Sequence, residues 1–141
     1  MAVSFTEAAK RHSTDASLLD TAKRTANANH LWGFAAECAL KAVLRGVDPT
    51  LFSATGVPGN AFKVHIDKLW PSAVNFFSGR SEAYLSSALP IAPNPFDQWS
   101  VHGRYDSDAD TPSATLHAQH QTAAKRCLSL LATARLNGHH E

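Results

Sequence analysis

The chain has only two cysteines, Cys38 and Cys127, in its 141 residues, which excludes a disulfide framework and a CxxC zinc site. Each lies in an apolar stretch with helical spacing, so we expect two small buried thiols. No apolar run approaches the roughly 20 residues that span a bilayer. The N-terminal residues 1–12 also lack the apolar core of a secretory signal. We therefore expect a cytoplasmic protein without a membrane segment.

An excess of charge of either sign is missing as well. Lysine and arginine number 13 against 12 acidic residues, a formal net charge of +1, so nothing in the overall charge favours nucleic acid. Any contact with RNA would have to be local. Charged residues make up 18% and hydrophobic residues 44% of the chain, which is typical of a globular protein. The length suits a single domain over residues 1–141 with a core of its own.

Helical periodicity covers most of the sequence. It predicts a first helix over 5–24, a central helix over 27–46, a third over 64–78, a short fourth over 81–89 and a last over 112–136. No strand pattern or internal repeat is evident. The predicted fold class is all-α, an up-and-down bundle of four to five helices.

The ends of two helices carry recognisable signals. Asn27 or Asn29 is expected to begin the central helix, and Gly46 to end it as a left-handed cap. Thr111 followed by Pro112 resembles a capping residue followed by the proline that is common at the first helical position. This predicts that the last helix begins there.

The central segment is apolar on nearly every side. Between Leu31 and Leu44 the only polar side chains are Glu37 and Lys41. A helix of this kind is buried among other helices. His30, Glu37 and Lys41 lie on one line along it, since they are spaced i, i+7 and i+11 at 100° per residue. They are either an edge-facing ion pair with a histidine at the helix start, or the polar lining of a cleft.

Residues 90–111 differ from the rest, with three prolines and no helical period, and predict a long ordered loop. Trp99 is expected to anchor this loop on the bundle. Arg104 is expected either to form a structural ion pair with Glu37 or an aspartate, or to bind a carboxylate or phosphate. If Arg104 approaches Glu37 and His30, one pocket results. The candidate catalytic residues are therefore His30, His102 and Arg104, and the candidate ligand-binding residues are Glu37, Lys41, Trp99 and Tyr105.

The remaining histidines and aspartates do not predict a metal or cofactor. His117 and His120 have helical spacing but no third ligand, so we expect a surface pair. The aspartates of residues 106–110 resemble the start of a calcium loop, but the glycine that such a loop needs is missing, so we expect a solvated loop. His139-His140 is expected to be a disordered tail.

The segment A-x-HL-x-GFAAECALKAxL, which comprises Ala28, His30, Leu31 and Gly33 to Leu44, resembles the HEPN superfamily in its branch of small bacterial proteins. His65 with Leu69, and Trp99 with Arg104-Tyr105, support the resemblance. It implies an up-and-down helical bundle that forms a homodimer. It also implies either a metal-independent ribonuclease of a toxin–antitoxin or phage-defence system, or a binding module without catalysis.

Catalytic members of that superfamily carry an arginine followed, after four to six residues, by a histidine. Arg24 with His30 and Arg135 with His140 have this spacing, but chance alone predicts about one such pair. Neither arginine precedes the asparagine that is often found there. We therefore expect a homodimeric binding or regulatory module for a nucleotide, RNA or partner protein. The alternatives are a divergent metal-independent ribonuclease toxin that uses His30, His102 and Arg104, or an interaction subunit for a nucleotidyltransferase-type antitoxin.

Overall fold

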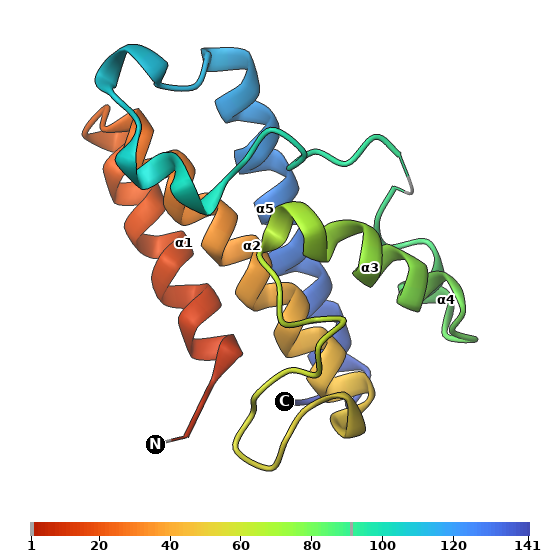
Figure 1. The fold of residues 1–141 in the computed structure, drawn as a ribbon. Coiled ribbons are helices and arrows are strands. Elements are labelled where there is room, and N and C mark those ends of the chain that lie inside the picture. Colours follow the sequence, from red (N-terminus) through yellow and green to blue (C-terminus); the bar gives the residue numbers. More distant parts are fainter. Residues whose placement is uncertain (1, 91) are drawn as a thin grey trace.

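A computed structural model describes residues 2–90 and 92–141 and has an all-α fold (Figure 1). It contains no strand in those residues, which confirms the predicted fold class. Nor does any described helix combine the length and apolar character needed to cross a membrane. The α-helices are α1 (Phe5–Thr21), α2 (Thr25–Val47), α3 (Ile66–Ser78), α4 (Ala83–Ser86) and α5 (Ala114–Leu136), and the short 3-10 helices are η1 (Pro49–Leu51), η2 (Val101–Tyr105) and η3 (Asp108–Asp110).

Helix α2 is the centre of the bundle, with α1 and α5 packed along it. Every residue of α2 from Ala35 to Leu44 is buried. Small alanines at several of these positions let the neighbouring helices approach closely, while Leu40 and Leu44 fill the space between them. Each fully buried leucine contributes about 1.5–3 kcal/mol to folding. The prediction of a buried central helix is confirmed.

Both ends of α2 lie beyond the predicted positions. The helix begins at Thr25, before Asn27, and continues past Gly46 to Val47, so the prediction that Gly46 is a left-handed cap was wrong. Gly46 is needed for another reason. A Cβ atom there would lie 2.8 Å from the carbonyl oxygen of His139, which leaves no room for a side chain.

Helix α5 begins two residues after the predicted start. The Ser113 hydroxyl accepts the Leu116 N–H at 3.1 Å and caps the helix. The Thr111 hydroxyl instead donates to the carbonyl of Asp108 at 2.8 Å, at the end of η3. The Thr111 side chain is thus bonded to the preceding loop and does not cap α5.

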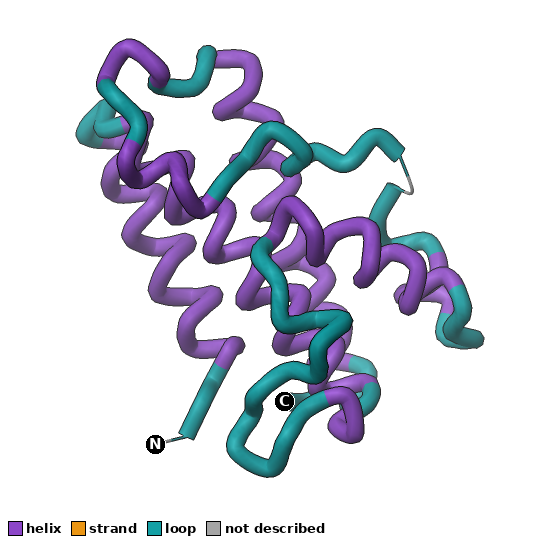
Figure 2. The backbone as a smooth tube through the Cα atoms, in the orientation of Figure 1, coloured by secondary structure: helices purple, strands orange, loops and turns teal. Residues whose placement is uncertain are grey.

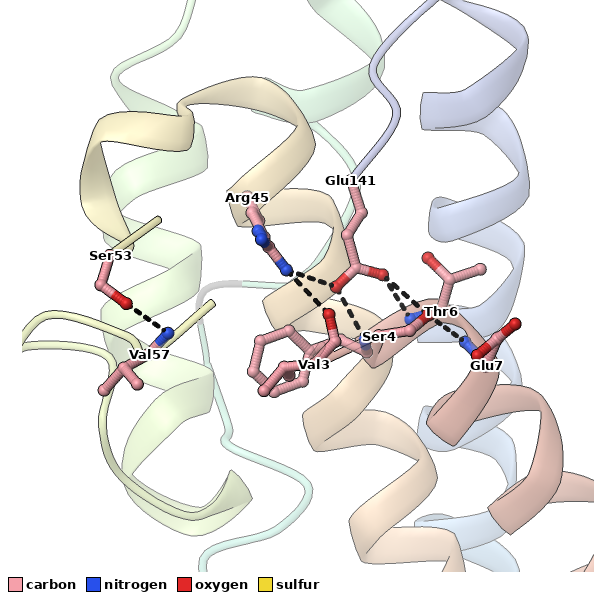
Figure 3. A network of polar contacts seen from close by, with 9 residues as sticks. Val3, Ser4, Thr6, Glu7, Arg45, Ser53, Val57 and Glu141 are labelled. Atoms are coloured by element: carbon pink, nitrogen blue, oxygen red, sulfur yellow. Dashed lines mark hydrogen bonds and ion pairs between the residues drawn. The ribbon is translucent and has the colours of Figure 1, made fainter. Parts of the chain in front are cut away.

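The prediction of a disordered C-terminal tail was also wrong. His139 stacks on Tyr84 of α4 and is hydrogen-bonded to its hydroxyl. The Glu141 carboxylate accepts the backbone N–H groups of Phe5 and Thr6, each at 2.7 Å, at the start of α1 (Figure 3). Arg45 of α2 donates to the same carboxylate at 3.4 Å. A carboxylate is favourable at a helix N-terminus, so this segment ties α5 to α1, α2 and α4.

Helices α3 and α4 project from the layer formed by α1, α2 and α5, and long loops connect them to it (Figure 2). The loop that contains Trp99 and η2 returns across α2 near its N-terminal half. The Trp99 side chain is 3% exposed and donates its indole N–H to the Asn29 carbonyl at 3.2 Å. The prediction that Trp99 anchors this loop is confirmed.

Candidate functional site

The polar line on α2 holds a buried ion pair. Glu37 and Lys41 are each only 7% exposed, and Lys41 Nζ donates to Glu37 at 3.1 Å. His65, the residue that precedes α3, donates from Nδ1 to the other Glu37 oxygen at 3.0 Å. Its side chain is 48% exposed. Glu37 therefore connects α2 to the start of α3, and the pair does not lie at an exposed edge.

Arg104 does not complete this line. Its guanidinium donates to the Val101 carbonyl at 3.1 Å and lies over the ring of Tyr105, 4.6 Å from the centroid. No ion pair within the described residues includes Arg104, so the predicted pair with Glu37 or an aspartate was wrong. The physical reason is local, because the tight turn of η2 brings the arginine back onto its own backbone. His102 and Tyr105 are exposed on the same segment.

The structure instead gathers three histidines around one phenylalanine of α2. The ring of the half-buried Phe34 lies 4.8 Å from His30, 5.8 Å from His12 of α1 and 6.2 Å from His65. Trp99 packs against Phe34 at 5.5 Å and stacks on His30 at 5.4 Å. We call His12, His30, Phe34 and His65 the histidine cluster. It combines one predicted site residue, His30, with two histidines that were not among the candidates.

The surroundings of His30 and His12 favour their neutral imidazoles. Burial lowers the pKa of His30 below its usual value, and the charge of Arg104 lowers this pKa further. Burial and then Arg11 lower the pKa of His12, against smaller opposing effects of Asp15 and Glu37. At neutral pH the two rings are therefore largely uncharged, and Arg11 and Arg104 provide permanent positive charge beside them.

A small cleft of about 160 Å³ adjoins the cluster. His30, Asn29 and Trp99 line it together with Gly103 and several residues of the loop between Asp106 and Pro112. Glu37 and Arg104 do not contribute to it. Of the predicted pocket, only the part formed by His30 and Trp99 is present.

A second polar network, which the sequence did not reveal, crosses the interior. The Asn29 amide donates to Nδ1 of His117 at 3.1 Å and to Nδ1 of His120 at 2.9 Å. Since both Nδ1 atoms accept, the ring protons of both histidines must be on Nε2. His120 is 1% exposed and His117 is half-buried, so the prediction of a surface pair was wrong. The spacing predicted their shared helix face, but it could not show that α2 covers that face.

Asp20 of α1 completes this network. One oxygen of its carboxylate accepts Nε2–H of His117 at 2.6 Å. The other accepts the indole N–H of Trp32 at 2.7 Å and the amide of Gln121 at 3.1 Å. The network therefore joins α1, α2 and α5 by side-chain hydrogen bonds.

Comparisons with protein-family models, curated proteins and solved structures gave no match. Within residues 2–90 and 92–141, no group of three or more histidine, cysteine or acidic side chains could hold a metal ion. Cys38 and Cys127 are buried free thiols, as predicted.

The buried network predicts sensitivity to acid. Burial is the main cause that lowers the pKa of His120 from 6.5 to about 4, ahead of the electrostatic effect of His117, and Asp97 and the Pro95 carbonyl oppose this only in part. Between these two pH values the unfolded chain binds a proton that the folded chain does not. The contribution of neutral His120 to the free energy of unfolding is therefore fully present above pH 6.5 and is lost as the pH falls toward 4. We expect the free energy of unfolding to fall by about 3 kcal/mol over this range through His120 alone. Urea unfolding at several pH values should show a shallower decline for His120→Gln, but an unchanged decline for the exposed His140→Gln.

Proposed function

We propose that this chain is a HEPN-like module that binds a nucleotide unit, either free or within single-stranded RNA, at the histidine cluster. The observation that carries the proposal is the convergence of His12, His30 and His65 on the half-exposed ring of Phe34. As the resemblance implies, we also propose that the module is a homodimer.

The chemistry of the cluster suits such a ligand. Uncharged rings stack on bases, at about 1–3 kcal/mol per base, and this stacking tolerates any base because each has a π-face. Arg11 and Arg104 are exposed and lie close enough to affect His12 and His30 electrostatically. Guanidinium groups bind phosphate oxygens through two parallel hydrogen bonds. A base on the rings with its phosphate toward an arginine would use both features.

One observation favours a second candidate, metal-independent RNA cleavage. Buried Glu37 orients the partly exposed His65, while His30, on the same Phe34 ring, is uncharged at neutral pH. A neutral imidazole can take the proton of a ribose 2′-OH, whose oxygen then attacks the adjacent phosphorus. The 5′-oxygen leaves with a proton from a second imidazole, and a 2′,3′-cyclic phosphate results. Arg104 would stabilise the charge that develops on the phosphate.

Fluorescence anisotropy with labelled single-stranded RNA at low salt tests both candidates. We expect His30→Ala and Arg104→Ala each to weaken binding about tenfold, which corresponds to roughly 1.4 kcal/mol. Arg126→Ala, which removes an exposed arginine from α5, should leave binding unchanged. The same RNA is then incubated with the protein in EDTA and its products are separated on a gel.

The outcomes distinguish the two candidates. Binding without cleavage supports the module, and cleavage that His65→Ala abolishes supports the enzyme. If neither RNA nor mononucleotides bind at millimolar concentration, or if Arg126→Ala weakens binding as much as Arg104→Ala, the site assignment is wrong.

A further inference from the structure

Helices α1 and α5 both pack against α2, and a groove lies between them. It consists of two depressions of about 410 and 650 Å³ that share Ser13 and Leu128 and are therefore continuous. We call it the α1–α5 groove. Trp32 of α2 lines it, and since Trp32 and Phe34 project about 200° apart, the groove faces away from the histidine cluster.

The groove has an apolar surface with exposed leucines at both ends. Leu128 and Leu131 of α5 line it beside Ala132. Leu18, near the end of α1, is 64% exposed, and Leu136, at the end of α5, is 88% exposed. Such exposure costs free energy in water, and an apolar patch with a polar border marks a contact surface.

The charged side chains that line the groove are all basic. They are Lys10 on α1, and Lys125 and Arg135 on α5, with His140 beside them. None of the three permanent cations belongs to an ion pair in the described part of the chain. Lys125 lies over the Trp32 ring at 5.8 Å. The groove thus combines an apolar surface with basic side chains that form no ion pair within residues 2–90 and 92–141.

We infer that the α1–α5 groove binds an amphipathic helix of a partner protein, one whose apolar stripe is flanked by acidic residues. The groove extends along α1 from Lys10 to Thr21, which is about 17 Å or three helical turns. Helices of this kind bind such grooves by their apolar face. A second copy of this chain fits poorly, because a symmetric contact would bring the same cations together. This inference is independent of the proposed RNA site.

A designed peptide of about 15 residues tests the inference directly. It carries leucines at i, i+3, i+4 and i+7 with glutamates on both sides, and a fluorescein label reports its binding to the full chain by anisotropy. A second peptide has lysine at every glutamate position. We expect micromolar binding of the acidic peptide and at least tenfold weaker binding of the basic one.

Variants locate the binding site. Lys125→Glu reverses one groove charge, and Ala132→Tyr fills the groove at an exposed position. Each is expected to weaken binding of the acidic peptide at least tenfold. Lys68→Glu makes the same charge change at an exposed position of α3 outside the groove and should have no effect. Circular dichroism confirms that each variant is folded, and two variants at separate positions keep the test valid if one is not.

Three results would overturn the inference. The first is no binding of the acidic peptide at millimolar concentration. The second is equal binding of both peptides, since charge would then play no part. The third is a dimer in analytical ultracentrifugation that both Lys125→Glu and Ala132→Tyr dissociate, because a second copy would then cover the groove.

Discussion

Glu37→Ala is expected to lower the free energy of unfolding by about 3–5 kcal/mol, because it leaves the Lys41 ammonium buried without a partner. Lys41 is only 7% exposed. Among the described residues, its ammonium donates a side-chain hydrogen bond to Glu37 alone. His65 loses its acceptor as well. Urea unfolding followed by circular dichroism measures the loss.

A double variant separates two contributions to the free energy of unfolding, the penalty of an unpaired buried charge and the net stabilisation by the ion pair. Glu37→Leu combined with Lys41→Met removes both charges and keeps apolar volume at the site, so we expect stability near that of the wild type. Glu82→Ala is the matched control, since it removes the carboxylate that Arg80 binds near the surface and should barely move the midpoint. If Glu37→Ala were as stable as the double variant, the Lys41 ammonium would have to reach solvent.

The all-α fold could be predicted from the sequence because the composition of the central segment indicates it. A helix that is apolar on nearly every side is stable only when other helices cover it, and the segment from Leu31 to Leu44 has that character. Trp99 could also be predicted to anchor its loop, because burial of a large aromatic side chain stabilises the fold more than burial of the polar residues around it.

The candidate site could be predicted only in part, because periodicity gives the face of a helix but not its neighbour. The position of Glu37 in an apolar helix marks it as a candidate, yet its partner His65 lies 28 residues away on another element. The His117–Asp20 contact spans 97 residues. Several histidines were available for each carboxylate, and nothing in their spacing selects one. The predicted ion pair of Arg104 is absent for a local reason, since its guanidinium donates to the Val101 carbonyl of its own turn.

Gly33→Ala is expected to displace Trp99 and to lower the free energy of unfolding by about 2–4 kcal/mol. A Cβ atom at Gly33 would overlap the indole ring of Trp99, and α2 cannot easily shift to avoid it because its residues from Ala35 to Leu44 are all buried. Losing a buried tryptophan costs about 3–5 kcal/mol. Replacing glycine by alanine inside a helix returns about 1 kcal/mol.

Denaturant unfolding and tryptophan emission measure this effect together. Trp32 and Trp70 are buried elsewhere, so a red shift in emission would report that Trp99 has left its site. Gly79→Ala is the matched control, because a Cβ atom there meets only ordinary contacts, the nearest at 3.6 Å. Unchanged emission and stability in Gly33→Ala would show that Trp99 does not pack against α2 at this point.

Combining Gly33→Ala with Trp99→Ala tests whether the two effects have one cause. If the overlap with the indole is the only reason for glycine at this position, alanine is harmless once the ring is gone. The double variant should then be as stable as Trp99→Ala, or about 1 kcal/mol more stable through its better helix propensity. Additive losses would instead mean that Gly33 has a role apart from Trp99. Since Trp99 also stacks on His30, both single variants should weaken binding at the histidine cluster, which links the packing of α2 to the proposed function.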